Sequence, residues 1–68
     1  MFLEELRKKR IAVGLSQDAL AQKIGIARSS LTLIELGKRK PSYEIMVKIS
    51  KVFNEPVEIK HKTYRKKG

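Results

Sequence analysis

The sequence of 68 residues contains no cysteine, a single histidine and no long apolar run. Without cysteine it has neither a disulfide framework nor a thiolate metal site, so helix packing or oligomerisation must supply its stability. No apolar run approaches the roughly 18 residues that a membrane span needs, and the N-terminus lacks the basic-then-apolar order of a secretory signal. We therefore expect a cytoplasmic protein without a membrane partner.

Acidic residues are also few, because 7 Asp and Glu stand against 16 Lys and Arg and give a formal net charge of +9. This charge density attracts polyanions, and nucleic acid is a stronger candidate than an anionic membrane surface. The length corresponds to one domain, which buries only roughly 60% of the surface that its unfolded chain exposes. The core is therefore expected to be modest.

The residues that carry most enzymatic chemistry are missing or isolated. His61 lies in a basic segment with no cysteine and no carboxylate cluster nearby, so neither a metal site nor a nucleophile–base pair can be assembled. No glycine-rich phosphate loop is present, since Gly14, Gly25 and Gly37 all fall at predicted helix ends. The sequence predicts no catalytic residue, no metal and no cofactor, and hence a protein that is not an enzyme.

Apolar residues at helical spacing predict the first two helices. Phe2, Leu6 and Val13, with Arg10 between them, indicate an amphipathic first helix that Gly14 ends. Ser16 is a suitable N-cap for a short second helix, whose apolar positions are Leu20, Ala21 and Ile24. The next apolar pair follows within a few residues of Gly25, at Leu31 and Ile34. Two short helices therefore meet across a tight turn.

A fourth helix is predicted after the loop of residues 37–41, where Ser42 can act as its cap. Its apolar positions are Ile45, Met46, Ile49, Val52 and Phe53. Asn54 and Pro56 mark its end. From Val57 to Tyr64 apolar or uncharged and polar residues alternate, which favours a short strand.

Two segments carry a resemblance to a known family: LSQDALAQKIGI at residues 15–26 and IELGKRKPS at residues 34–42. Together they strongly resemble the Cro and lambdoid-phage repressors, the Xre-type helix-turn-helix family, over about residues 6–53. The resemblance implies an all-α, compact lambda-repressor-like domain of four or five helices at residues 1–56. Residues 57–68 would form a basic extension with a short β-strand. It also implies a sequence-specific regulator of transcription, a repressor, that binds double-stranded DNA.

In such a motif the second helix lies in the major groove of DNA, and residues 28–36 occupy that position here. Leu31 and Ile34 continue the apolar contacts, so the outward positions, our candidates for base reading, are Arg28, Ser29, Thr32 and Leu33. Arg28 can bind guanine O6 and N7; a merely solvated arginine is disfavoured in a first helical turn, where it opposes the helix dipole. Ser29 and Thr32 can bind bases or phosphates, or only water. Leu33 can contact a thymine methyl group or be an ordinary exposed leucine.

Phosphate contacts are expected at both ends of the motif. Gln17 matches a position that touches the DNA backbone in the family, and the free amides of its helix N-terminus add to it. Lys38, Arg39 and Lys40 can reach flanking phosphates, or simply keep their loop solvated. Ser42 is chiefly a helix cap, in a neighbourhood that family members use for backbone bonds.

Arg10 and Glu35 resemble a pair that joins the first and third helices in this family. We interpret them as a structural salt bridge. The alternative is an Arg10 that binds phosphate, which would leave Glu35 as an unpaired carboxylate in the interior.

Proteins of this type usually bind as two-fold dimers to half-sites about 34 Å apart, so we expect a homodimer. One hypothesis is that the C-terminal strand pairs with its symmetry mate through Val57, Ile59, His61 and Thr63. The alternative is an arm that tracks phosphates. A second functional class also remains open, an antitoxin-like protein that masks a protein partner and binds DNA only to regulate itself.

Overall fold

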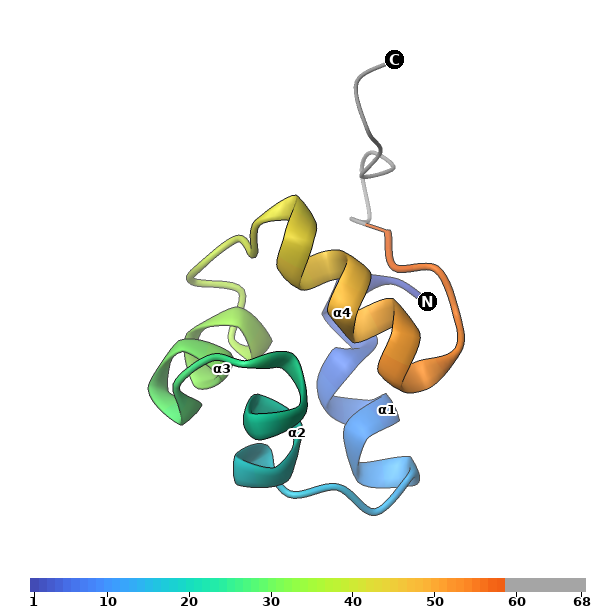
Figure 1. Cartoon of the computed structure of the whole chain (residues 1–68), viewed down its shortest axis with the longest axis horizontal. Helices are drawn as coiled ribbons and strands as arrows, with labels where there is room; N and C mark the ends of the chain where they lie inside the picture. The colour runs from blue at the N-terminus through green and yellow to red at the C-terminus, as the bar shows by residue number, and fades with distance from the viewer. Residues whose placement is uncertain (59–68) are drawn as a thin grey trace.

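The computed structural model describes residues 1–58, which form one short 3-10 helix and four α-helices. Their bounds are η1 Leu3–Glu5, α1 Leu6–Ala12, α2 Gln17–Ile24, α3 Arg28–Glu35 and α4 Tyr43–Phe53. In Figure 1 α3 lies on the side of the molecule opposite α1, with α2 between them and α4 above. The predicted all-α class with four α-helices is confirmed.

The predicted helix caps are present. Ser16 Oγ accepts a hydrogen bond from the Ala19 amide at 3.0 Å, and Ser42 Oγ accepts one from the Ile45 amide at 3.2 Å. Each bond satisfies one of the free amides at a helix N-terminus. At the C-terminal ends, Gly25 (φ 74°) closes α2 and Asn54 (φ 56°) closes α4 in the left-handed conformation.

The core is built around α2, which packs against both α3 and α4. The buried apolar side chains of the core are those of Leu6, Leu20, Ala21, Ile24, Leu31, Ile34, Met46, Ile49 and Val57. The apolar positions expected on α2 and α3 are all buried, as are Met46 and Ile49 of α4, because helical spacing puts them on one side of each helix. This packing fixes α3 relative to α2.

The first helix differs from its prediction. Phe2 is 40% exposed and Val13 58% exposed, so neither belongs to the buried face. Helical spacing predicts one continuous helix from Phe2 to Val13. In the structure Phe2 is extended, η1 precedes α1, and α1 ends before Val13. Leu3 packs against the core beside Leu6 instead.

Val57, the first residue of the predicted C-terminal strand, is placed differently from its prediction. Val57 is only 7% exposed and belongs to the core of its own chain, so its side chain is not available to a symmetry mate. Glu58 pairs in parallel with Phe2 through bonds from the Leu3 amide to the Glu58 carbonyl (2.6 Å) and from the Glu58 amide to the Met1 carbonyl (2.8 Å). Val57 and Glu58 therefore pack with the helices, although the domain boundary was expected at residue 56. Ile59, His61 and Thr63 lie outside the described residues.

Charged groups join the start of the chain to the end of α4. Lys9 Nζ donates to Glu55 Oε2 at 2.9 Å, and the Met1 amino group lies 3.5 Å from Glu55 Oε1. The hydrogen bond from Lys9 and its positive charge hold the pKa of the Glu55 carboxyl below its usual range. The same contact raises the pKa of Lys9. Within residues 1–58 no helix is both long and apolar enough to cross a membrane.

Candidate nucleic-acid interface

The exposed face of α3 carries the candidate base-reading residues. Helix α3 turns Leu31 and Ile34 into the core, and this leaves Arg28 and Ser29 exposed and Thr32 and Leu33 half-buried. These four outward residues, Arg28, Ser29, Thr32 and Leu33, line one shallow depression. The structure thus brings the predicted base-reading residues together on one surface, which is called the α3 face below.

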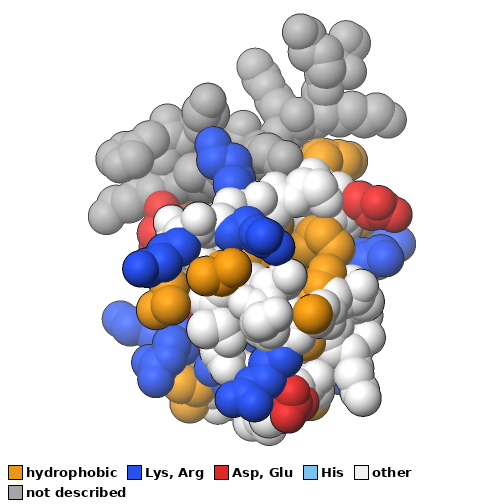
Figure 2. Space-filling model, turned by 90° about the vertical axis from the view of Figure 1, so that its left-hand side faces the viewer, with side chains coloured by type: hydrophobic (Ala, Val, Ile, Leu, Met, Phe, Trp, Pro, Cys, Tyr) orange, Lys and Arg blue, Asp and Glu red, His pale blue; other side chains and the backbone are white. Residues whose placement is uncertain are grey.

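Figure 2 views the molecule from the side on which α3 lies in Figure 1. Lys and Arg side chains lie around a surface there that includes both hydrophobic and uncharged polar side chains, and acidic side chains are few. A positive surface of this kind attracts the phosphates of a duplex. The charge excess that the sequence predicts is therefore present around the α3 face.

Arg28 has weak partners that its sequence position did not suggest. Its Nε donates to Gln17 Oε1 at 3.5 Å and lies 3.9 Å from Asp18 Oδ1. Its side chain is nevertheless 64% exposed, and these contacts use Nε alone. The two Nη groups have no partner within residues 1–58, so they remain free to bind a ligand bidentately.

Gln17 is held by α3 and does not project freely from α2. Its Nε2 donates to Glu35 Oε1 at 3.0 Å. Its Oε1 accepts from Thr32 Oγ1 at 3.3 Å, in addition to the long contact from Arg28. The phosphate contact predicted for Gln17 can therefore use only the second hydrogen of its amide. Sequence reasoning missed this positioning role, because it depends on how α2 and α3 cross.

The Thr32 hydroxyl already has acceptors inside the protein. Its Oγ1 lies 3.1 Å from the Arg28 carbonyl oxygen and 3.3 Å from Gln17 Oε1. A hydroxyl has one hydrogen to donate but two lone pairs to accept with. Thr32 is thus arranged to accept a hydrogen bond from a ligand, such as the exocyclic amine of adenine or cytosine.

Arg10 and Glu35, the predicted ion pair, face each other between α1 and α3. Arg10 Nε donates to Glu35 Oε2 at 2.7 Å, and Nη2 donates to Oε1 at 3.2 Å. Nη1 donates to the Leu15 carbonyl at 2.9 Å. The two side chains are only 9% and 2% exposed. Gln17 supplies a further donor to Glu35, so the carboxylate links α1, α2 and α3.

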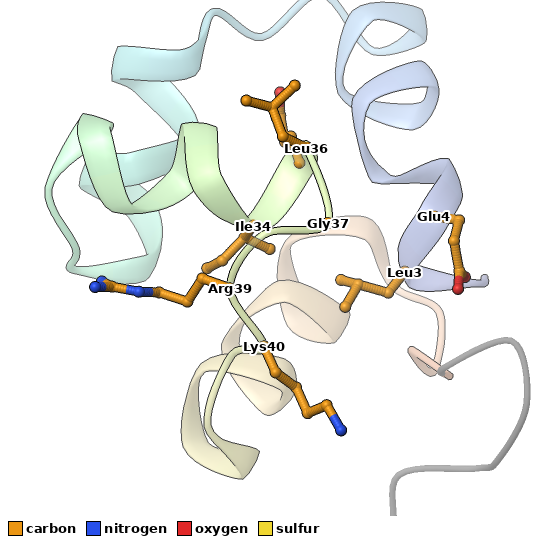
Figure 3. Close-up of a pocket in the computed structure, with 8 residues that line it drawn as sticks. Leu3, Glu4, Ile34, Leu36, Gly37, Arg39 and Lys40 are labelled. Atoms are coloured by element: carbon orange, nitrogen blue, oxygen red, sulfur yellow. The ribbon is translucent and has the colours of Figure 1, made fainter.

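The basic loop after α3 does not act as one cluster. Lys38, Arg39 and Lys40 are all exposed, but Figure 3 shows Arg39 and Lys40 pointing in different directions. Arg39 extends along α3, where its Nη1 donates to Ser30 Oγ at 3.1 Å. Lys40 points away, beside a hollow between η1 and the loop that is lined by Leu3, Glu4, Ile34, Glu35, Leu36, Gly37, Arg39 and Lys40.

One basic residue near the α3 face was not among the predicted contacts. Arg7 lines a polar depression at the N-terminal end of α2 together with Arg10, Ser16, Gln17, Asp18 and Arg28. Its spacing of three residues from Arg10, which puts both on one side of a helix, is the signal that could have identified it.

Within residues 1–58 no group of three His, Cys, Asp or Glu side chains could hold a metal ion.

Comparison with known proteins places this geometry among related chains. A family model described as helix-turn-helix matches residues 6–60. An HTH-type transcriptional regulator of Archaeoglobus fulgidus is 38% identical over 53 residues, 78% of this chain and 76% of that protein. The regulator YqaE of Bacillus subtilis is 41% identical over 54 residues, which cover 79% of this chain but 47% of YqaE.

A solved structure agrees with these relatives. The crystal structure of the restriction-modification controller protein C.AhdI from Aeromonas hydrophila superposes with a TM-score of 0.72 at 34% identity. The match covers 78% of this chain and 80% of that one. The helical arrangement is therefore shared with a protein of similar extent.

Proposed function

Because the chain belongs to the Xre- and Cro-like helix-turn-helix family of DNA-binding transcriptional regulators, we propose that it is a repressor that reads a specific duplex with α3. The observation that carries this proposal is the α3 face, where all four candidate base-reading side chains share one outward depression. A major groove about 12 Å wide admits one helix with its side chains. The structural relative named as a controller protein supports a regulatory role.

Each side chain of the α3 face has a distinct chemical role in this proposal. The free Nη groups of Arg28 suit guanine O6 and N7, a contact worth about 1–3 kcal/mol of discrimination. Thr32 accepts from an exocyclic amine, since its hydrogen is engaged within the protein. Leu33 contacts a thymine methyl group, and Ser29 binds a base edge or a phosphate.

Phosphates are bound on either side of the α3 face. One contact region lies at the N-terminal end of α2. It consists of Arg7, the second amide hydrogen of the Gln17 side chain and the free backbone amides of the helix. In the loop after α3, the exposed Lys38 and Arg39 supply contacts on the other side, and Lys40, which points in another direction, reaches a separate phosphate. The Ser42 hydroxyl oxygen accepts from Ile45, which leaves its hydrogen free for a phosphate oxygen.

The repressor acts as a homodimer on two half-sites about 34 Å apart, because one short helix contacts only a few base pairs. Because Val57 is buried within its own chain, we do not place the dimer contact on a strand that begins at Val57. Our candidate is a shallow groove along α4 that the edge of Val57 helps to line, together with Tyr43, Met46, Val47, Ser50 and Pro56.

Selection of tight binders from a random pool of duplexes tests the proposal, because it reports base preference, symmetry and half-site spacing together. Replacing Arg28, Thr32 and Leu33 with alanine should abolish the preference of the folded protein. A matched control, Lys38→Ala, should weaken all duplexes alike and lower the salt slope by about one. A folded triple variant that keeps the same preference by the same margin would refute the role of α3.

The dependence of affinity on salt separates the repressor from a protein that chiefly masks a protein partner. Six or more phosphate contacts should cost about three orders of magnitude in affinity between roughly 50 and 200 mM salt, with base preference retained. A partner-masking protein requires neither property.

A further inference from the structure

A second basic surface lies apart from the α3 face, where the ends of α1 and α2 meet the C-terminal half of α4. It is a shallow groove lined by Val13, Leu15, Lys23, Lys48, Lys51 and Val52, and it is called the lysine groove below. No residue of α3 or of the loop after α3 lines it. Binding of a duplex to the α3 face therefore does not require contact with the lysine groove.

The floor of the lysine groove is apolar. Val13 follows the last residue of α1, and its side chain is 58% exposed. Leu15 and Val52 are half-buried and pack against the core. The floor thus offers apolar surface to an occupant and is backed by the core.

The rim of the lysine groove is positive. Lys23, Lys48 and Lys51 are exposed, and within residues 1–58 none of them has an ion pair or a side-chain hydrogen bond. Lys23 and Lys51 lie in the last turns of α2 and α4, where a positive charge is favourable. Lys48 reaches over the end of α2, since a β-carbon at Gly25 would lie 3.8 Å from its Nζ.

Helix ends explain why each lysine is tolerated, but they do not explain why three positive charges surround one apolar floor. No carboxylate lines the groove. Like charges gathered in this way repel one another, and an anionic occupant removes that repulsion. An occupant with both carboxylates and apolar side chains would complement the rim and the floor together.

We propose that the lysine groove binds an acidic, amphipathic segment of a partner protein. One or two apolar side chains of this segment rest on Val13, Leu15 and Val52, and its carboxylates pair with the three lysines. A duplex matches this surface less well, because its backbone offers phosphates and sugars but no apolar side chain for the floor. This function goes beyond DNA reading and leaves the α3 face free to hold DNA at the same time.

Titration of the isotope-labelled full chain with synthetic peptides, followed by amide chemical shifts, tests the proposal. The probe is a helical peptide with glutamates on one face and leucines three and four residues apart on the other. A second peptide replaces every glutamate with lysine, and a third replaces every leucine with serine. We expect saturable shifts at Val13, Leu15, Lys23, Lys48 and Val52 with the first peptide alone.

Variants separate specific docking from general attraction to a basic protein. Lys48→Gln should weaken the acidic peptide by up to about fivefold, whereas Lys8→Gln, the same charge change at an exposed position of α1, should leave the affinity within about twofold. Val13→Ser should also weaken it, because the floor loses apolar surface. None of these substitutions should alter base preference on the α3 face.

Several results would overturn the proposal. One is the absence of saturable shifts in the lysine groove, and another is equal weakening by Lys48→Gln and Lys8→Gln. Shifts confined to the α3 face would mean that the peptide only imitates DNA. Equal shifts of the groove amides on addition of a random duplex would make the groove a nucleic-acid site. Concentration-dependent shifts there without any peptide would mean that a second copy covers it.

Discussion

Replacing Arg10 with methionine should destabilise the fold before it changes base preference. The substitution keeps an unbranched apolar stem but removes the guanidinium that donates twice to Glu35 and once to the Leu15 carbonyl. The Glu35 side chain, which is 2% exposed, would retain only the donor from Gln17. Breaking a buried ion pair in this way costs about 3–5 kcal/mol, because a charge is left in the interior without its partner.

That cost is large relative to the whole domain. At about 0.05–0.15 kcal/mol per residue, a chain of this length has a total unfolding free energy of roughly 3–10 kcal/mol. Arg10→Met should therefore leave a substantial fraction of the protein unfolded. The double substitution Arg10→Met with Glu35→Met removes both charges and should recover most of the stability, since an apolar pair often replaces a buried ion pair at little cost. The hydrogen bonds lost by Leu15 and Gln17 would still cost about 1 kcal/mol each.

Urea unfolding followed by circular dichroism measures these differences, provided that the slope with denaturant is unchanged. Base preference is measured in parallel on the folded fraction at low temperature. The reasoning fails if Arg10→Met melts like the parent protein and yet no longer binds DNA, because Arg10 would then be a phosphate ligand. It also fails if the double variant is less stable than the single one.

Three further predictions concern the helix ends and the contact between the start of the chain and α4. Ser16→Ala should lower the unfolding free energy by about 1 kcal/mol through loss of the cap on α2, with Ser16→Gly costing less, as urea midpoints will show. Gly37→Ala should cost about 1–2 kcal/mol, because φ is +77° there while nothing lies within 4 Å of the added β-carbon; Gly37→Asn should cost less, and an equal cost would contradict a backbone origin. Glu55→Gln should lower the melting temperature near neutral pH. Because the folded-state pKa of Glu55 is depressed, the difference from the parent should vanish as the pH falls through that pKa, and a difference that persists in acid would exclude the ion pair as its cause.

Much of the fold follows from local rules that the sequence states directly. Ser16 and Ser42 cap helices because a serine side chain can reach the amide three residues later. Gly25 and Asn54 end helices because they tolerate a positive φ. Helical spacing likewise identified Leu31 and Ile34 as buried, and hence Arg28 and Thr32 as outward. Each inference needs only residues within one turn of one another.

The predictions that failed depended on contacts between distant segments. The exposure of Phe2 and the burial of Val57 both follow from the pairing of the first residues with Glu58, which no local pattern encodes. The same holds for the dimer contact expected from Val57, because its side chain is buried in the core of its own chain.

The sequence by itself determined helices α2, α3 and α4 and the outward residues of α3, because local spacing and capping chemistry are sufficient for these, and the resemblance of two segments indicated the family. Only the tertiary structure decided what Gln17 does, because its amide is oriented by Glu35 and Thr32 across the crossing of two helices. Only the tertiary structure also brought three lysines from α2 and α4 around one apolar floor. Packing decides which side chains from separate helices meet, and that information is not present in any single helix.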